Sequence, residues 1–146
     1  LIHGDYKLDN LVIGSNSKCL AVLDWELSAF GEPEVDLSFQ MINWLIPKGV
    51  LYGIGLEWES HHIPSAQEFL SSYEKTYGKM VNVETLNIYC LFSLMKLYCI
   101  LKGIENRIKA GNAASAEASD KVKGASGIKD ALMLAYQNYP NNMIVS

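Results

Sequence analysis

The first ten residues hold side chains whose types and spacing could catalyse transfer of a phosphoryl group. His3, Asp5 and Asn10 stand in the pattern H-x-D-x-x-x-x-N, and Lys7 follows Asp5 by two residues. A carboxylate such as Asp5 can orient or accept the proton of an attacking hydroxyl, and a lysine can meet negative charge on the transferred group. The amide oxygen of Asn10 and a second carboxylate, Asp24, are the kind of ligands that Mg²⁺ prefers.

The segments between these residues follow the order of a kinase catalytic core. Protein kinases carry H-R-D-x-x-x-x-N and then an acidic D-F-G. Here Asn10 leads into an apolar run over 11–13, and a polar turn follows. A second apolar run over 19–23 ends on Asp24. The pattern predicts loop, strand, turn, strand and metal-binding acid, and its alternative is an ordinary hairpin with polar ends.

Longer strings extend the pattern beyond the short motif. The chain reads His3-Gly4-Asp5, then Val22-Leu23-Asp24-Trp25-Glu26-Leu27-Ser28, then Gly31-x-Pro33-x-x-Asp36-Leu37. It resembles the aminoglycoside phosphotransferase and choline kinase superfamily, which usually has H-G-D in place of H-R-D. Within that superfamily it is most similar to the phosphotransferase domain of acyl-CoA dehydrogenase family members 10 and 11. Looser similarity follows over 63–65 and 100–113.

The residues and the resemblance together assign roles to nine side chains. The expected catalytic residues are Asp5, Lys7 and His3. The expected ligands of Mg²⁺ and of its bound ATP are Asn10 and Asp24. The resemblance implies that Asp36 is a structural support that anchors the catalytic loop, residues 1–10, although Asp36 could also simply complement a helix dipole. The candidate substrate contacts are Trp25, Glu26 and Arg107.

Apolar periodicity predicts a mostly helical chain after the hairpin. We expect helices over 34–46, 65–77, 83–109 and 125–138, with an irregular stretch over 47–64 and a flexible loop over 110–126. The box Ser65-Ala66-Gln67-Glu68 marks one helix start. The expected fold is α+β, a mostly helical C-terminal lobe of a protein-kinase-like phosphotransferase with a short β-hairpin at the catalytic loop. We expect residues 1–146 to form a single-domain fragment whose N-terminal lobe is absent, because the chain opens on its catalytic motif.

Composition narrows the class of partner. A net charge of −4 argues against nucleic acid as the main partner, and 49% hydrophobic content is typical of a globular chain. The longest apolar run is about sixteen residues and is too short and too interrupted for a membrane span. The three cysteines lie in apolar runs, which predicts buried free thiols and an intracellular location. A mitochondrial or peroxisomal location follows only from the resemblance.

The expected activity is ATP- and Mg²⁺-dependent phosphoryl transfer to a hydroxyl of a small molecule. The short segment between Asp24 and Pro33 leaves no room for the long activation segment of protein-directed kinases. The resemblance implies a 4-hydroxyacyl-CoA or hydroxy fatty acid as acceptor, in fatty acid catabolism, with fusion to an acyl-CoA dehydrogenase domain in a longer parent protein. An aminoglycoside, choline or fructosamine-type acceptor is the alternative, since Glu57 and Glu59 could bind a cation. A non-catalytic pseudokinase fragment acting by protein contact is the second alternative, and this chain alone is expected to be inactive.

Overall fold

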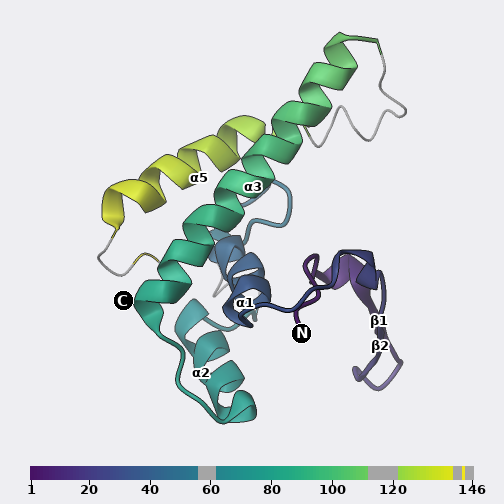
Figure 1. The fold of residues 1–146 in the computed structure, drawn as a ribbon, viewed down its shortest axis with the longest axis vertical. Coiled ribbons are helices and arrows are strands. Elements are labelled where there is room, and N and C mark those ends of the chain that lie inside the picture. Colours follow the sequence, from purple (N-terminus) through teal and green to yellow (C-terminus); the bar gives the residue numbers. More distant parts are fainter. Residues whose placement is uncertain (56–61, 112–121, 140–142, 144–146) are drawn as a thin grey trace.

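The computed structural model describes residues 1–55, 62–111, 122–139 and 143. A two-stranded hairpin lies to one side of a helical body (Figure 1). The strands are β1 (Leu11–Ile13) and β2 (Cys19–Val22), and the helices are α1 (Glu34–Met41), α2 (Ala66–Tyr77), α3 (Val83–Lys109) and α5 (Ala125–Asn138). Short 3₁₀ turns that lie wholly within the described residues include η1 (Leu8–Asn10), η2 (Trp25–Leu27) and η3 (Ile42–Trp44). This arrangement confirms the predicted fold class.

The hairpin is antiparallel and brings the two ends of the motif together. Leu11 pairs with Val22, and the backbone N–H of Leu23 donates to the carbonyl oxygen of Asn10 at 2.8 Å. Asp24, the residue after Leu23, therefore leaves the hairpin at the end where Asn10 enters it. Strand β2 ends at Val22, one residue before the predicted end at Leu23.

The helix boundaries follow local capping. The predicted capping box is present at α2: the side chain of Ser65 accepts from the backbone of Glu68, whose carboxylate accepts from the backbone of Ser65. Asn82 caps α3 in a similar way through Thr85. The continuous helix predicted over 34–46 was wrong, since α1 ends at Met41 and continues as η3. Because η3 is only three residues long, its apolar spacing does not distinguish an α-helix of about 3.6 residues per turn from a 3₁₀ turn of about 3.0.

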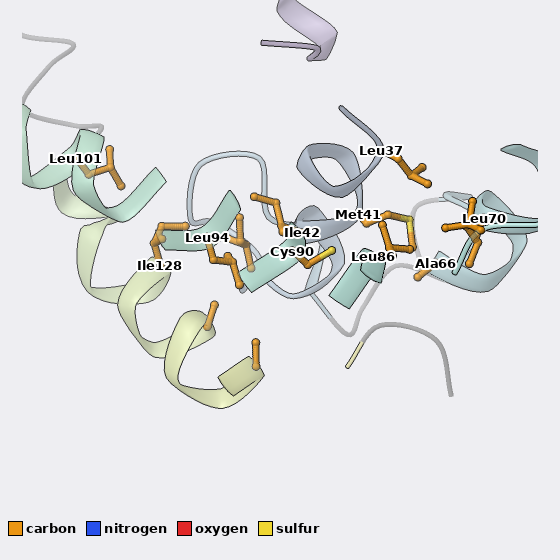
Figure 2. Close-up of a cluster of buried hydrophobic side chains, with 14 of the residues drawn as sticks. Leu37, Met41, Ile42, Ala66, Leu70, Leu86, Cys90, Leu94, Leu101 and Ile128 are labelled. Carbon is orange, nitrogen blue, oxygen red and sulfur yellow. The ribbon is translucent and has the colours of Figure 1, made fainter. Parts of the chain in front are cut away.

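The core forms where α3 packs against α1 and α5, with side chains from α2 completing one end (Figures 1 and 2). Met41 of α1, Leu86 and Leu94 of α3 and Ile128 of α5 are fully buried. Burying one such side chain contributes about 1.5–3 kcal/mol. Residues of α3 thus hold the helical body together, and α1 connects that body to the hairpin.

Apolar residues on several faces of the helix over 83–109 predict that it is mostly buried, and this prediction was wrong. Ile88 and Phe92 are 49% and 53% exposed, because the α1 and α5 contacts cover other faces of the helix. By length and composition α3 could cross a membrane, but core helices of globular proteins pass the same test, and the buried residues of α3 pack in the core described above. The predicted burial of the cysteines holds only for Cys90, since Cys19 and Cys99 are exposed.

Much of the loop predicted over 110–126 lies outside the described residues. Its final residues, Ala125 and Ser126, already belong to α5, where Ala125 is buried. The irregular stretch predicted over 47–64 contains neither α-helix nor strand in its described parts, 47–55 and 62–64.

Candidate active site

The catalytic loop brings two of the predicted polar residues, Lys7 and Asn10, to the carboxylate of Asp5. The ammonium of Lys7 donates to Oδ2 of Asp5 at 2.7 Å, and the amide Nδ2 of Asn10 lies 3.3 Å from the same oxygen. Among the described residues, no group binds the other oxygen, Oδ1 of Asp5. Both Asp5 and Lys7 are partly accessible, with side chains 24% and 29% exposed. Asp5 therefore has one oxygen held by the protein and one available to a hydroxyl group.

Asn10 and Asp24 fit the donor set that Mg²⁺ requires. The Nδ2 group of Asn10 also donates to the carbonyl oxygen of Asp5 at 2.9 Å, which turns its amide oxygen the other way. Asp24 is exposed and holds a left-handed backbone with φ of 66°, a conformation that Asp adopts more readily than most other residues apart from glycine. In the described part of the chain, no three His, Cys, Asp or Glu side chains cluster as a metal site. An amide and a carboxylate oxygen would thus share the ion with phosphate oxygens.

His3 is buried, and both of its ring nitrogens are engaged by backbone groups. It is 2% exposed, and its Nδ1 accepts the backbone N–H of Asp5 at 3.2 Å. Its Nε2 therefore carries the proton and donates to the carbonyl oxygen of Leu23 at 2.8 Å. His3 was predicted as catalytic; its contacts are those of a residue that joins the loop of Asp5 to the strand end before Asp24.

Asp36 binds the backbone of the first residues of the motif. One carboxylate oxygen accepts the backbone N–H of His3 at 2.6 Å, and the other accepts that of Gly4 at 2.9 Å. Such charge-assisted bonds are stronger than neutral ones. Asp36 lies in the first turn of α1, so it fixes the catalytic loop onto the helical body.

Gly4 is required by its surroundings. Its φ of +82° favours glycine, and a Cβ at this position would lie 2.4 Å from the carbonyl oxygen of Leu27. The close approach of the two backbones brings the catalytic loop against η2, immediately after Asp24. This packing gives a physical reason for H-G-D in this sequence.

Sequence reasoning missed three side chains that hold or flank the loop. Lys96 of α3 donates to the carbonyl oxygen of Gly4 at 3.1 Å, and Gln40 of α1 donates to that of Tyr6. Tyr52 donates to Asp9 at 2.5 Å. Lys96 could have been noticed in the sequence because it interrupts an apolar helix face. No feature of the sequence pairs Gln40 with Tyr6 or Tyr52 with Asp9.

A cavity of about 630 Å³ opens beside the catalytic loop. Its lining is mostly apolar and comes from the catalytic loop, α1, η3, the segment 46–54, α2 and α3. The polar or charged lining side chains are those of Lys7, Gln40, Asn43, Lys48 and Tyr52, and no described lining residue is a carboxylate. The hydrogen bond to Asp9, with burial and the nearby Asp5, raises the pKa of Tyr52 to about 12. Because Lys7 lines the cavity and binds Asp5, a molecule in the cavity would lie next to the candidate base.

The candidate substrate contacts are dispersed. Trp25 packs its ring against His3 with centroids 4.7 Å apart, and its N–H donates to the carbonyl oxygen of Val22. Glu26 is exposed on η2, and Arg107 is exposed on the last turns of α3. None of the three lines the cavity. Arg107 belongs to the C-terminal end of α3, and Figure 1 shows this end of the helix apart from the N-terminal segment and the hairpin.

Comparison with known proteins explains this combination of motif and fold. Residues 1–68 match the model of the family described as "Phosphotransferase enzyme family". These residues belong to that family. The structure also superposes on the crystal structure of a "putative aminoglycoside phosphotransferase" from Ralstonia eutropha JMP134, with a TM-score of 0.80 and 34% identity, over 93% of this chain and 42% of that chain.

Curated relatives extend the similarity past the family match. Acyl-CoA dehydrogenase family member 10 of Mus musculus is 33% identical over 127 residues, which cover 84% of this chain. Acyl-CoA dehydrogenase family member 11 of Homo sapiens is 35% identical over 117 residues, covering 79% of this chain. These matches confirm the resemblance stated from the motifs. The chain spans only 12% and 15% of the length of these two relatives.

Proposed function

We propose that this phosphotransferase-family chain supplies the catalytic base, the metal ligands and the acceptor pocket of an ATP- and Mg²⁺-dependent small-molecule kinase. The observation that carries the proposal is the ion pair between Asp5 and Lys7, because Lys7 lines the 630 Å³ cavity. A base beside a pocket that can hold an acceptor is what hydroxyl-directed phosphoryl transfer needs, since this chemistry depends on positioning and charge neutralisation.

Each residue then has a defined task. Oδ1 of Asp5 orients the acceptor hydroxyl and takes its proton as the new O–P bond forms and the bond to the leaving ADP breaks. Lys7 holds Oδ2 of Asp5 and meets the charge of the transferred group. Asn10 and Asp24 would bind Mg²⁺, which neutralises the phosphates when present. His3 and Asp36 keep the loop in place.

The cavity lining supports an acceptor with an apolar chain. Phe39, Leu51 and Leu97 are among its walls, and no described lining residue is an acid that would bind an amine. A hydroxylated fatty acyl group, as a 4-hydroxyacyl-CoA, fits such a pocket better than a cationic amino sugar or choline. Glu57 and Glu59, the acids that would favour a cation, lie outside the described residues. The acyl-CoA dehydrogenase relatives support the same choice, by analogy.

A coupled ADP-release assay tests the proposal. The longest natural form of the protein would be assayed with MgATP and three acceptors: a 4-hydroxyacyl-CoA, choline and an aminoglycoside. We expect turnover on the hydroxyacyl thioester and none on the two cations. Turnover on choline or on the aminoglycoside would contradict the proposed acyl acceptor. Absence of both turnover and ATP binding would favour a pseudokinase that acts by protein contact.

A further inference from the structure

One hydrogen bond joins the wall of the acceptor cavity to the catalytic loop. The hydroxyl of Tyr52 donates to Oδ2 of Asp9 at 2.5 Å, across 43 residues of sequence. Tyr52 lines the cavity, while Asp9 lies in η1, directly before Asn10. The same residue therefore touches the space for the acceptor and the segment that carries the base and a metal ligand.

The backbone around Tyr52 is held in one conformation. The N–H of Gly53 donates to the carbonyl of Val50 at 2.8 Å, and that of Ile54 donates to the carbonyl of Asn43 at 2.8 Å. A Cβ at Gly53 would lie 2.3 Å from the carbonyl oxygen of Pro47, so only glycine fits there. Leu51 has a φ of 47°, an unfavourable conformation for a branched side chain. A segment that keeps such a conformation just before Tyr52 directs that side chain specifically.

We infer that Tyr52 is a positioning residue for the acceptor: its ring forms one wall of the cavity and its bond to Asp9 fixes that wall relative to Asp5. The inference rests on the proposed function and names the residue that aligns the substrate. Nothing in the H-G-D motif or in the D-x-x-x-x-N spacing assigns a role to either Tyr52 or Asp9.

The chemistry of the pair suits a donor and an acceptor at neutral pH. The Tyr52 hydroxyl is protonated at that pH, as tyrosines ordinarily are, and its hydrogen bond to Asp9 raises its pKa further, to about 12. The nearby charge of Asp5 contributes to the same shift, so the hydroxyl is within electrostatic reach of the candidate base. Loss of the hydrogen bond would leave the ring present but free to move, and an acceptor hydroxyl beside it would meet Oδ1 of Asp5 less often.

Single and double variants of the longest natural form test the inference in the ADP-release assay with 4-hydroxyacyl-CoA substrates of increasing chain length. Tyr52→Phe removes only the hydroxyl, and we expect kcat to fall about tenfold while the KM for ATP stays within about twofold. Asp9→Ala should give the same loss, and the double variant should be no worse than either single one. Asp9→Asn keeps an oxygen acceptor and should retain most activity. Tyr136→Phe, an exposed tyrosine on α5, is the matched control.

The series of acyl chain lengths distinguishes a role of Tyr52 as a wall of the cavity from a general structural role. Tyr52→Ala removes the ring and should shift the preferred acyl chain toward longer or bulkier acceptors, which a merely destabilised protein would not do. Unchanged kcat in Tyr52→Phe, with a wild-type protein that turns over the thioester, would overturn the inference and leave the proposed function intact. A wild-type protein inactive on the thioester would overturn both.

Discussion

The ammonium group of Lys96 donates a hydrogen bond to the carbonyl oxygen of Gly4 at 3.1 Å, although 92 residues separate the two. Asp36 accepts the N–H of Gly4 from another direction, at 2.9 Å. The peptide groups on both sides of Gly4 are thus held by charged side chains, one from α3 and one from α1. The two central helices of the body together determine where Asp5, the next residue, lies.

We therefore predict that Lys96→Met lowers kcat more than it weakens ATP binding. A partly buried hydrogen bond from a charged group contributes about 1.5–3 kcal/mol, so the expected loss in kcat is about tenfold or more. The measurement is steady-state kinetics with ATP titration. Lys129→Met, at an exposed lysine on α5, is the control and should be neutral. Equal kinetics for the two variants would show that Lys96 does not position the loop.

Gly4→Ala should damage both stability and activity. The new Cβ would lie 2.4 Å from the carbonyl oxygen of Leu27, and the φ of +82° adds backbone strain. Gly49→Ala is a matched control, since Gly49 has a φ of +84° and no atom within 4 Å of the added Cβ. Both variants carry about 1 kcal/mol or more of conformational strain, and only Gly4→Ala also has the clash. Denaturant unfolding should rank Gly4→Ala clearly below Gly49→Ala, and equal stability would argue against the clash.

The sequence predicted what short-range chemistry determines. The capping box at Ser65, the start of α3 at Val83 and the two strands follow from residues close together in sequence. The spacing of His3, Asp5 and Asn10 likewise comes from one loop, so its members could be named before the fold was known. Their catalytic roles stay predictions.

Long-range contacts could not be predicted in this way. Lys96 and Tyr52 reach the catalytic loop from 92 and 43 residues away, and neither distance leaves a local pattern. Apolar periodicity did not predict that Ile88 and Phe92 are exposed, because an apolar helix face has the same sequence pattern whether or not another element covers it. The burial predicted for Cys19 was wrong for a similar reason. Strand β2 belongs to a two-stranded sheet, and the side chain of Cys19 is exposed.

Thiol reactivity should divide the cysteines into two classes. Burial raises the pKa of the Cys90 thiol and removes it from solvent, whereas Cys19 and Cys99 are exposed. Because the thiolate is the reactive species, a thiol-specific chromogenic reagent should label Cys19 and Cys99 in the native protein and Cys90 only after denaturation. Peptide mapping identifies the labelled sites. Rapid native labelling of Cys90 would contradict the packing between α3 and α1.

Acid should weaken the end of α3. The carboxylate of Glu105 accepts from Lys102 and, at 2.6 Å, from Lys109, and these bonds lower its pKa to about 2. A depressed pKa stabilises the folded state above the unfolded value, near pH 4.5, and this contribution is lost as the pH falls toward 2. Glu105→Gln should thus be less stable than wild type at pH 6 and equal to it near pH 2. Asp130→Asn is the control, and a difference that is independent of pH would contradict the ion-pair explanation.

Asp5 and Asp24 should fail in different ways if their proposed roles are right. Asp5→Asn removes the proton acceptor and keeps the size of the side chain, so transfer should fall by a factor of about 10² or more while MgATP binding is nearly unchanged. Asp24→Asn removes a charged metal ligand, so it should weaken nucleotide binding, and the loss should be partly offset by raising the Mg²⁺ concentration. Calorimetric titration of ATP at several Mg²⁺ concentrations, together with single-turnover rates, separates the two effects. Nucleotide binding that is lost in Asp5→Asn and kept in Asp24→Asn would reverse the assignment, and full activity in both variants would remove the catalytic loop from the mechanism.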